Sequence, residues 1–485
     1  MRIIKTIFFA GAVLLSVVSC DNLDNLNIDQ KAYTKVVPSA LMTNAQVNYA
    51  YFLTNASVNS NNFRAYAQHW STSTYTDEAN YNQAKRNLGS SHAILLYRDV
   101  LQDLTNAQIQ IREAQALGPI EEAVKKNNIA ILDVQIVMAY QTLVDLFGNV
   151  AYTEALNVKA FPYPKYDDAK TIYLDLAARL DVAIASMDTA NGSFGAADLV
   201  FKGDVSRWKI LANSVKLKMG LHLADVDPVK AKAMVESAYT SGVMTNESET
   251  ALFDYYLTNT DMNPLYDSLV NESQIIISAF FADELNGKLD PRRDFFFNPD
   301  SKINGEYKGA PYAQQVNYSN YSNTGARLKK KNNPGVLFDY TETCFLLADA
   351  ANRGFSVGGT PEEYYTKGIK ASMKFWGVAD AAAQTYLARP DVAFATAAGT
   401  DKQKIAYQLW IAYYNRGFEA WTEYRRLDYP VLTAPVSAVA EAEGKVPVRN
   451  IYSTNDKTLN KANYEAASAA IGGDLMTTKI FWDKF

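Results

Sequence analysis

The chain has 485 residues, of which 20% are charged and 48% hydrophobic, and its formal net charge is −5. A nearly neutral chain whose only basic triplet is Lys329-Lys330-Lys331 lacks the clustered positive face that phosphate contacts need, so we predict no nucleic-acid partner. Tyrosine is the compositional outlier, with 31 Tyr against 22 Phe and 6 Trp. Because tyrosine combines an apolar ring with a polar tip, tyrosines in loops are candidates for ligand contact.

The N-terminus has the pattern of an export signal. Two basic residues, Arg2 and Lys5, precede an apolar run over 6–18 that is too short to span a bilayer, and small residues then lead to Cys20. This ending resembles a bacterial lipobox, in which the cysteine is acylated and becomes the new N-terminus. An ordinary cleaved signal and a single-span anchor are the alternatives.

The lipobox interpretation divides the chain into three parts. We expect a lipoprotein signal peptide at 1–19, an acylated Cys20 with a flexible polar tether over 20–30, and a single globular body over 31–485. Several acyl chains give lasting membrane attachment, whereas one chain gives only marginal binding. No second apolar run is expected to span a membrane.

The body that follows shows mainly helical periodicity. Apolar residues recur at steps of three and four in three segments, 129–147, 172–187 and 208–219. Strand signals are sparse and include Ile275-Ile276-Ile277. The sequence therefore predicts a mainly α fold in which successive helices pack as antiparallel pairs.

Helix boundaries are also predicted from local signals. Thr360 with Pro361 and Glu363 forms a capping box, Thr400 with Gln403 forms a second one, and Asp227 caps a helix that begins with Pro228 and stops at Gly242. On a helical stripe, Cys344 falls with Tyr340, Leu347 and Ala351, so it is expected to be a small core residue and not a reactive thiol.

Three long stretches, 54–90, 291–336 and 428–463, break the helical pattern. Coils of this length in a compact protein are usually functional or disordered. Two of them carry aromatic side chains among Asn, Gln and Ser, and these rings could stack on a ligand while the polar neighbours accept or donate hydrogen bonds. The predicted ligand-binding residues are Trp70, Tyr75, Tyr81, Tyr307, Tyr312, Tyr318, Tyr321 and Arg327. The alternative is that the same rings only pack the loops onto the body.

Catalytic and metal-binding patterns find little support. The chain has three His, no HExxH pair and no GxSxG elbow, so no catalytic residues are assigned and a serine or zinc hydrolase is not expected. A glycosidase needs only two carboxylates, which keeps a hydrolase as an alternative. Asp300 to Gly305 has the rhythm of a calcium loop, but Lys302 occupies a ligand position. We therefore predict no metal ligand and no cofactor.

Several motifs together resemble one family. The segment from Asp145 to Ala155 resembles the D-x-[YF]-G-D-V-P-Y-S-E-A stretch of SusD/RagB-like outer-membrane lipoproteins of the Bacteroidetes, and the segment from Gly203 to Met219 is similar to their G-D-x-x-x-W-x-K-F-A-N-S-L-K-L-R-M helix. Further similar landmarks follow in family order at 290–292, 346–354, 419–426 and 446–452, with Asn460 where the family keeps Asn.

The resemblance implies a tetratricopeptide-like scaffold of helix pairs with a ligand site in the intervening loops. It also implies a role as the lid of a SusC-like TonB-dependent barrel at the cell-surface face of the outer membrane, with capture of an oligosaccharide and no enzymatic activity. Within the family, capture of an oligopeptide is the alternative; a lipid-anchored hydrolase is the alternative outside it.

Overall fold

The computed structural model describes residues 36–258, 261–272 and 274–485. The signal peptide, the tether and the predicted lipid anchor Cys20 lie outside these residues.

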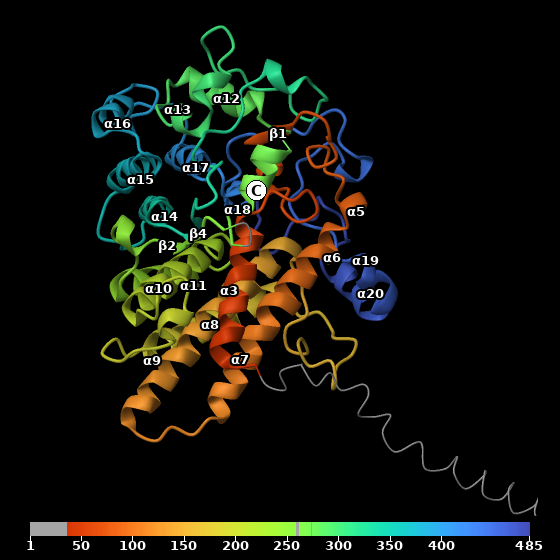
Figure 1. The fold of residues 1–485 in the computed structure, drawn as a ribbon, viewed down its shortest axis with the longest axis vertical. Helices are drawn as coiled ribbons and strands as arrows, with labels where there is room; N and C mark the ends of the chain where they lie inside the picture. The colour runs from red at the N-terminus through yellow and green to blue at the C-terminus, as the bar shows by residue number, and fades with distance from the viewer. Residues whose placement is uncertain (1–35, 259–260, 273) are drawn as a thin grey trace, which may run out of the picture.

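The fold is mainly α, as predicted (Figure 1). The first half contains α3 (Pro38–Thr54), α4 (Phe63–Tyr66), α5 (Gln83–Arg86), α6 (Leu88–Ala93), the π-helical η1 (Ile94–Leu101), α7 (Gln102–Glu113), α8 (Pro119–Phe147), α9 (Ala169–Ser186), α10 (Val205–His222) and α11 (Pro228–Ser241). The second half contains α12 (Ala279–Gly287), α13 (Arg293–Phe296), α14 (Tyr340–Asn352), α15 (Pro361–Trp376), α16 (Asp380–Leu387), α17 (Asp401–Ala412), α18 (Gly417–Leu427), α19 (Thr454–Leu459) and α20 (Lys461–Ala470).

Successive helices pack against one another in pairs: α7 with α8, α8 with α9, α10 with α11, α14 with α15 and α17 with α18. In Figure 1, α7 to α11 fill the lower part of the molecule, and α12 to α17 lie above them. The three predicted apolar stripes lie in α8, α9 and α10, where they supply much of the hydrophobic core. This arrangement confirms the tetratricopeptide-like scaffold.

Helix ends follow the predicted signals. Thr360 and Thr400 each complete a capping box, because each side chain accepts a hydrogen bond from the backbone N–H three residues later while that residue's side chain accepts in return. Asp227 caps α11, which ends at Gly242 with φ +106°. Cys344 in α14 is 1% exposed, and burial raises the pKa of its thiol to about 12, as expected for a core residue.

Helix α8 corrects one expectation about apolar runs. Within the described ranges it is the one helix long and apolar enough to cross a membrane, although 89% of its most apolar window is buried inside the protein. Its buried residues come from every side of the helix over the last four turns. A helix that is apolar all round and enclosed by protein serves as a core helix.

Polar residues from several motifs of the resemblance meet other buried polar groups in the core. Arg426 pairs with Asp349 at 2.5 Å and with Glu423 at 2.7 Å, and Glu423 in turn contacts Nε2 of His222 at 3.0 Å. Elsewhere Asp145 accepts a hydrogen bond of 2.8 Å from the indole of Trp482. These groups are buried and mutually satisfied, so they hold the helix pairs together and do not form a ligand surface.

Two small antiparallel sheets complete the fold. β1 (Trp70–Thr72) pairs with β3 (Ile275–Ile277), the predicted strand, with Trp70 opposite Ile277. β2 (Ala251–Phe253) pairs with β4 (Gly335–Phe338). Because β1 lies in the coil 54–90, its pairing with β3 fixes that coil to a distant part of the chain.

Candidate ligand-binding site in the loops

The structure brings the two predicted aromatic loops together. The backbone N–H of Val316 donates to the carbonyl of Ser73 at 2.9 Å, and the side-chain amide of Gln315 donates to the carbonyl of Thr74 at 2.9 Å. The hydroxyl of Tyr312 donates to the carbonyl of Ala65 at 2.7 Å. Residues 291–336 therefore support residues 54–90 along one edge, and this junction could not be read from the sequence.

A buried arginine anchors the junction from beneath. Arg64 is 2% exposed and donates to the carbonyls of Thr54, Asn55 and Asn415 at 2.8 to 3.1 Å. Its guanidinium lies over the ring of Trp70, 4.8 Å from the centroid. Burial lowers the pKa of Arg64 to about 9, because desolvation penalises the charged guanidinium and no carboxylate of the described residues forms an ion pair with it. Sequence reasoning missed Arg64, since its partners come from three separate segments.

Above Arg64 lies a small hollow, here called the loop cleft, with a volume of about 60 Å³. It is lined by Ala56, Val58, Asn61, Asn62, Arg64, Ala65, Trp70, Ser71, Thr72, Tyr75, Glu78, Ala79, Glu272, Gln274 and Ile275. Tyr75 at its rim is 56% exposed, so one flat ring is open to solvent. The loop cleft thus joins residues from both sides of the β1–β3 pair.

The wall of the loop cleft holds polar atoms that the fold does not satisfy. Within the described part of the chain, four side-chain oxygens of the lining have no hydrogen-bond partner: Oδ1 of Asn61, Oδ1 of Asn62, Oγ of Ser71 and Oε2 of Glu78. The other carboxylate oxygen of Glu78 accepts from Arg86 at 2.9 Å, and burial raises the pKa of Glu78. Buried polar groups are normally paired, so these four atoms are candidates for hydrogen bonds to a polar ligand that enters the cleft.

The predicted rings differ widely in exposure. Trp70 is 4% exposed and forms the inner wall, with its edge toward the ring of Tyr414 at 6.3 Å. Tyr81 is fully buried against Tyr66, and burial raises its pKa to about 12. The expectation that these two rings are displayed on the surface is wrong, because segments distant in sequence cover them.

The second cluster does not assemble into one surface. Tyr307 is 4% exposed and donates from its hydroxyl to Asp294 at 2.7 Å, so its expected display is also wrong. Tyr312, Tyr318 and Tyr321 are half-buried. Arg327 lies over the rings of Phe375 and Trp376 and donates to the carbonyl of Phe375. Whether any of these residues binds a ligand stays a prediction.

Polar residues of the cleft wall were only partly indicated by sequence. Asn61, Asn62 and Ser71 belong to the Asn- and Ser-rich coil that the sequence marks as a candidate. Glu78 and Gln274 carry no local signal, since one is a single acid among many and the other precedes a short strand.

Comparison with known proteins identifies a family that matches most of this chain. Residues 30–453 match the profile of the SusD-like family described as starch-binding and associating with the outer membrane. A search of curated proteins gave no match.

Solved structures are similar over nearly the whole chain. A chitin-binding protein is 25% identical with a TM-score of 0.76, over 92% of this chain and 100% of that one. A chitin-binding SusD homologue from Flavobacterium johnsoniae is 24% identical with a TM-score of 0.75, over 92% and 98%. A SusD homologue from Bacteroides uniformis is 24% identical with a TM-score of 0.75, over 92% and 99%. With a family profile matched across most of its length and these shared folds, the chain belongs to the SusD-like family.

Proposed function

We propose that the protein captures an oligosaccharide at the cell surface and that the loop cleft is where the sugar binds. The observation that carries this proposal is the open ring of Tyr75 in the same cleft as the unpartnered side-chain oxygens of Asn61, Asn62, Ser71 and Glu78. Membership of a family described as starch-binding, and similarity to two chitin-binding structures, support a carbohydrate ligand.

The chemistry of the cleft suits a sugar ring. One face of a pyranose is apolar enough to stack on a tyrosine, while its hydroxyls need partners once they leave water. A shallow cleft of about 60 Å³ cannot enclose an oligomer, so only one or two rings would contact it. Binding of moderate strength allows release, as transport requires.

The proposal extends to assembly and location. We propose that the protein is the lid of a SusC-like TonB-dependent barrel, anchored through acylated Cys20 on the outer face of the outer membrane. The family description as associating with the outer membrane supports the location. In this scheme the protein performs capture and handover without a cofactor and without catalysis.

The test is calorimetric titration of the full-length protein with chitin oligosaccharides and with malto-oligosaccharides. Binding of one series, weakened by Tyr75→Ala and retained by Tyr51→Ala, would support the proposal; Tyr51 is a matched tyrosine, 40% exposed on α3. Tight binding of an oligopeptide without any glycan binding would overturn it in favour of peptide capture.

Assembly and anchoring need a separate experiment. A tagged protein expressed with its neighbouring barrel should co-purify with that barrel in mild detergent, and Cys20→Ala should release the protein from the membrane fraction because acyl chains alone hold it there. A Cys20→Ala variant that stays with the membrane after high-salt washing would contradict the lipid anchor.

A further inference from the structure

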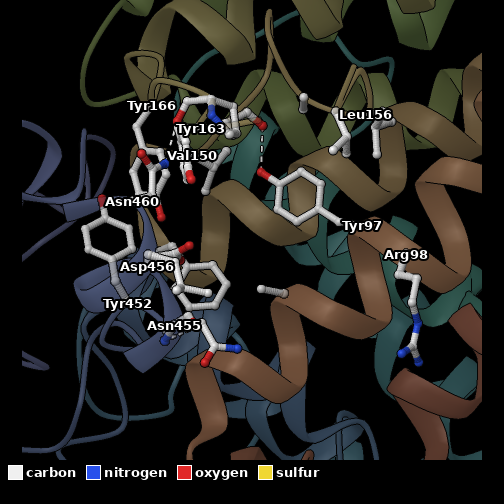
Figure 2. A pocket seen from close by; sticks show the side chains of 18 of the residues that line it. Tyr97, Arg98, Val150, Leu156, Tyr163, Tyr166, Tyr452, Asn455, Asp456 and Asn460 are labelled. Atoms are coloured by element: carbon white, nitrogen blue, oxygen red, sulfur yellow. Dashed lines mark hydrogen bonds between the residues drawn. The ribbon is translucent and has the colours of Figure 1, made fainter. Parts of the chain in front are cut away.

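A second and larger hollow lies away from the loop cleft, between α6, the loop 148–168 and α19 (Figure 2). Its volume is about 530 Å³, within the range of roughly 300 to 1,000 Å³ that small-molecule sites occupy. Four tyrosines line it: Tyr97, Tyr163, Tyr166 and Tyr452. We refer to this hollow as the tyrosine cavity.

Two of the four tyrosine hydroxyls are bonded to the backbone. The hydroxyl of Tyr97 donates to the carbonyl of Ala151 at 2.6 Å, and that of Tyr452 donates to the carbonyl of Asn149 at 2.9 Å. Both hydroxyls are thereby committed to the backbone. The lining also holds Arg98, Gln102, Ser453 and Asn460, but each of these side chains already bonds to another protein group. A sugar would therefore find few free partners for its hydroxyls here, and the cavity suits a more apolar ligand.

The frame of the cavity is fixed before any ligand arrives. The loop closes on itself through the bridge between Val150 and Asp167. On the other side, the side-chain amides of Asn463 and Asn460 donate to the carbonyls of Tyr163 and Pro164 at 2.9 and 2.8 Å. The ring of Tyr163 is 62% exposed, yet its backbone is held in place. Such pre-organisation lowers the entropic cost of binding.

One carboxylate in this apolar setting lacks a cation. Asp456 on α19 lines the cavity, and within the described residues it forms no ion pair, since its neighbour Lys457 pairs with Asp474 at 3.0 Å. Arg98 pairs with Asp99 at 2.6 Å, and its guanidinium points away from Asp456 in Figure 2. Burial and the charge of Asp474 raise the pKa of Asp456, and a hydrogen bond from Tyr166 only partly offsets them.

A carboxylate among tyrosine rings favours a positively charged ligand over a neutral one. A neutral apolar group would desolvate Asp456 further without compensation, whereas a positive charge would pair with it. Tyrosine faces carry the negative side of the ring quadrupole and attract an ammonium within about 6 Å. Apolar rim residues Val158 and Leu459, 73% and 71% exposed, would contact the carbon skeleton of the same ligand.

We propose that the tyrosine cavity is a second binding site, which takes an organic ammonium group with its charge at Asp456 and its carbon skeleton against the tyrosine faces. The ammonium can come from a free amine or from a lysine side chain of a partner protein. This assignment does not depend on glycan capture at the loop cleft.

The test compares charged and uncharged ligands of equal shape on the full-length protein in mild detergent. Benzylamine is titrated against benzyl alcohol, and Nα-acetyl-lysinamide against Nα-acetyl-norleucinamide, with binding followed by calorimetry and by protein NMR. We expect at least one amine to bind about tenfold more tightly than its uncharged match. Benzylamine binding would indicate a free amine, and binding of the lysine derivative alone would indicate a partner's lysine.

Variants locate the site. Asp456→Asn keeps the shape and should lower amine affinity to that of the uncharged match, and Tyr163→Ala, an exposed position, should weaken the amine while the melting temperature holds. Tyr51→Ala serves as the matched tyrosine control. Equal affinity of amine and uncharged match, no binding by either amine, or unchanged amine affinity in a folded Asp456→Asn protein would each overturn the proposal.

Discussion

The loop cleft and the tyrosine cavity show that the volume of a hollow does not decide its ligand. The cleft has about 60 Å³ and the cavity about 530 Å³, yet the smaller one has four unpartnered side-chain oxygens in its wall. In the cavity, the hydroxyls of Tyr97 and Tyr452 are already bonded to backbone carbonyls. Polar groups left without partners therefore favour a sugar at the cleft, and their scarcity favours an apolar cation at the cavity.

The two regions also differ in how they are held. Backbone pairing of β1 with β3 and the buried charge of Arg64 hold the cleft, so it depends on the helical body beneath it. The cavity depends on side-chain amides, Asn460 and Asn463, that hold one loop against α20. Changes to the scaffold and changes to either region should consequently have separable effects.

The largest expected effect comes from a substitution in the helical scaffold that supports both regions. Trp208 in α10 is 1% exposed, and its indole donates to Asp198 at 2.7 Å. Trp208→Ala should lower the free energy of unfolding by about 3 to 5 kcal/mol, because it leaves a cavity and removes one of the hydrogen bonds to the buried carboxylate of Asp198, which keeps its bond from the backbone N–H of Gly203. Urea denaturation measures the loss. A cost below about 1 kcal/mol would show that the scaffold relaxes around the gap.

Acid should weaken both regions through buried histidines. His69 precedes Trp70 of the cleft and His92 lies in α6 beside the cavity; burial lowers their pKa values to about 3 and about 4. Unfolded histidine has a pKa of about 6.5, so below that pH only the unfolded chain gains the protons and stability falls as pH falls. Between pH 7 and pH 5 each histidine should cost about 2 kcal/mol.

Denaturation of the wild type and His92→Leu at the two pH values measures this slope. Between pH 7 and pH 5 the variant should lose about 2 kcal/mol less free energy of unfolding than the wild type, whatever its stability at pH 7. Equal losses in both proteins would mean that His92 is protonated in the folded state.

A pair of glycines should separate the two regions. A Cβ at Gly89 in α6 would lie 2.4 Å from the carbonyl oxygen of Ile451, beside the cavity, and one at Gly417 would lie 2.5 Å from Cγ of Arg64, beneath the cleft. Each alanine substitution should cost about 1 to 3 kcal/mol, because backbone or packed atoms must move.

The two substitutions should have opposite effects on amine and glycan binding. Gly89→Ala should weaken amine binding and leave glycan binding intact, and Gly417→Ala should do the reverse. Titration of each variant with both ligand types tests this expectation. If both variants weaken both ligands equally, the two regions are not independent.

The smallest expected effect concerns a single ring. Tyr75→Ala should lower glycan affinity by about 1 kcal/mol and leave the melting temperature unchanged, because its ring is 56% exposed. Trp70→Ala should instead lower stability as well, since Trp70 is buried against Arg64; sequence alone predicts no such loss. Calorimetry with a melting curve for each variant distinguishes them. A large drop in melting temperature for Tyr75→Ala would mark that ring as structural.

Local patterns in the sequence predicted the ends and buried faces of several helices correctly. The boxes at Thr360 and Thr400, the cap at Asp227 and the apolar stripe of α8 depend on residues within a few positions of one another, and the structure confirms them. The family motifs occur in the order that the resemblance requires. Two of their residues, Glu423 and Arg426, form a buried ion pair and do not line the ligand site.

Ring exposure could not be predicted in the same way. Tyr81 and Tyr307 lie in polar coils, so nothing local indicates burial, yet Tyr66 and Asp294 with Phe297 cover them. The sequence could not predict the unpartnered oxygens in the wall of the loop cleft either, because the absence of a hydrogen bond depends on every neighbouring atom in space. The tyrosine cavity gave no signal either, since its walls come from residues 89–102, 147–166 and 452–460.

The bond between Trp482 and Asp145 has a consequence for the timing of folding. Asp145 also accepts from Tyr173, and Trp482 stacks near the guanidinium of Arg425, which lies 4.8 Å from its ring centroid. Residues from three parts of the chain thus close one core, and the two that share the Trp482–Asp145 bond are 337 positions apart. A chain synthesised N-terminus first cannot complete this core until residue 482 has left the ribosome, so this part of the core closes only at the end of synthesis.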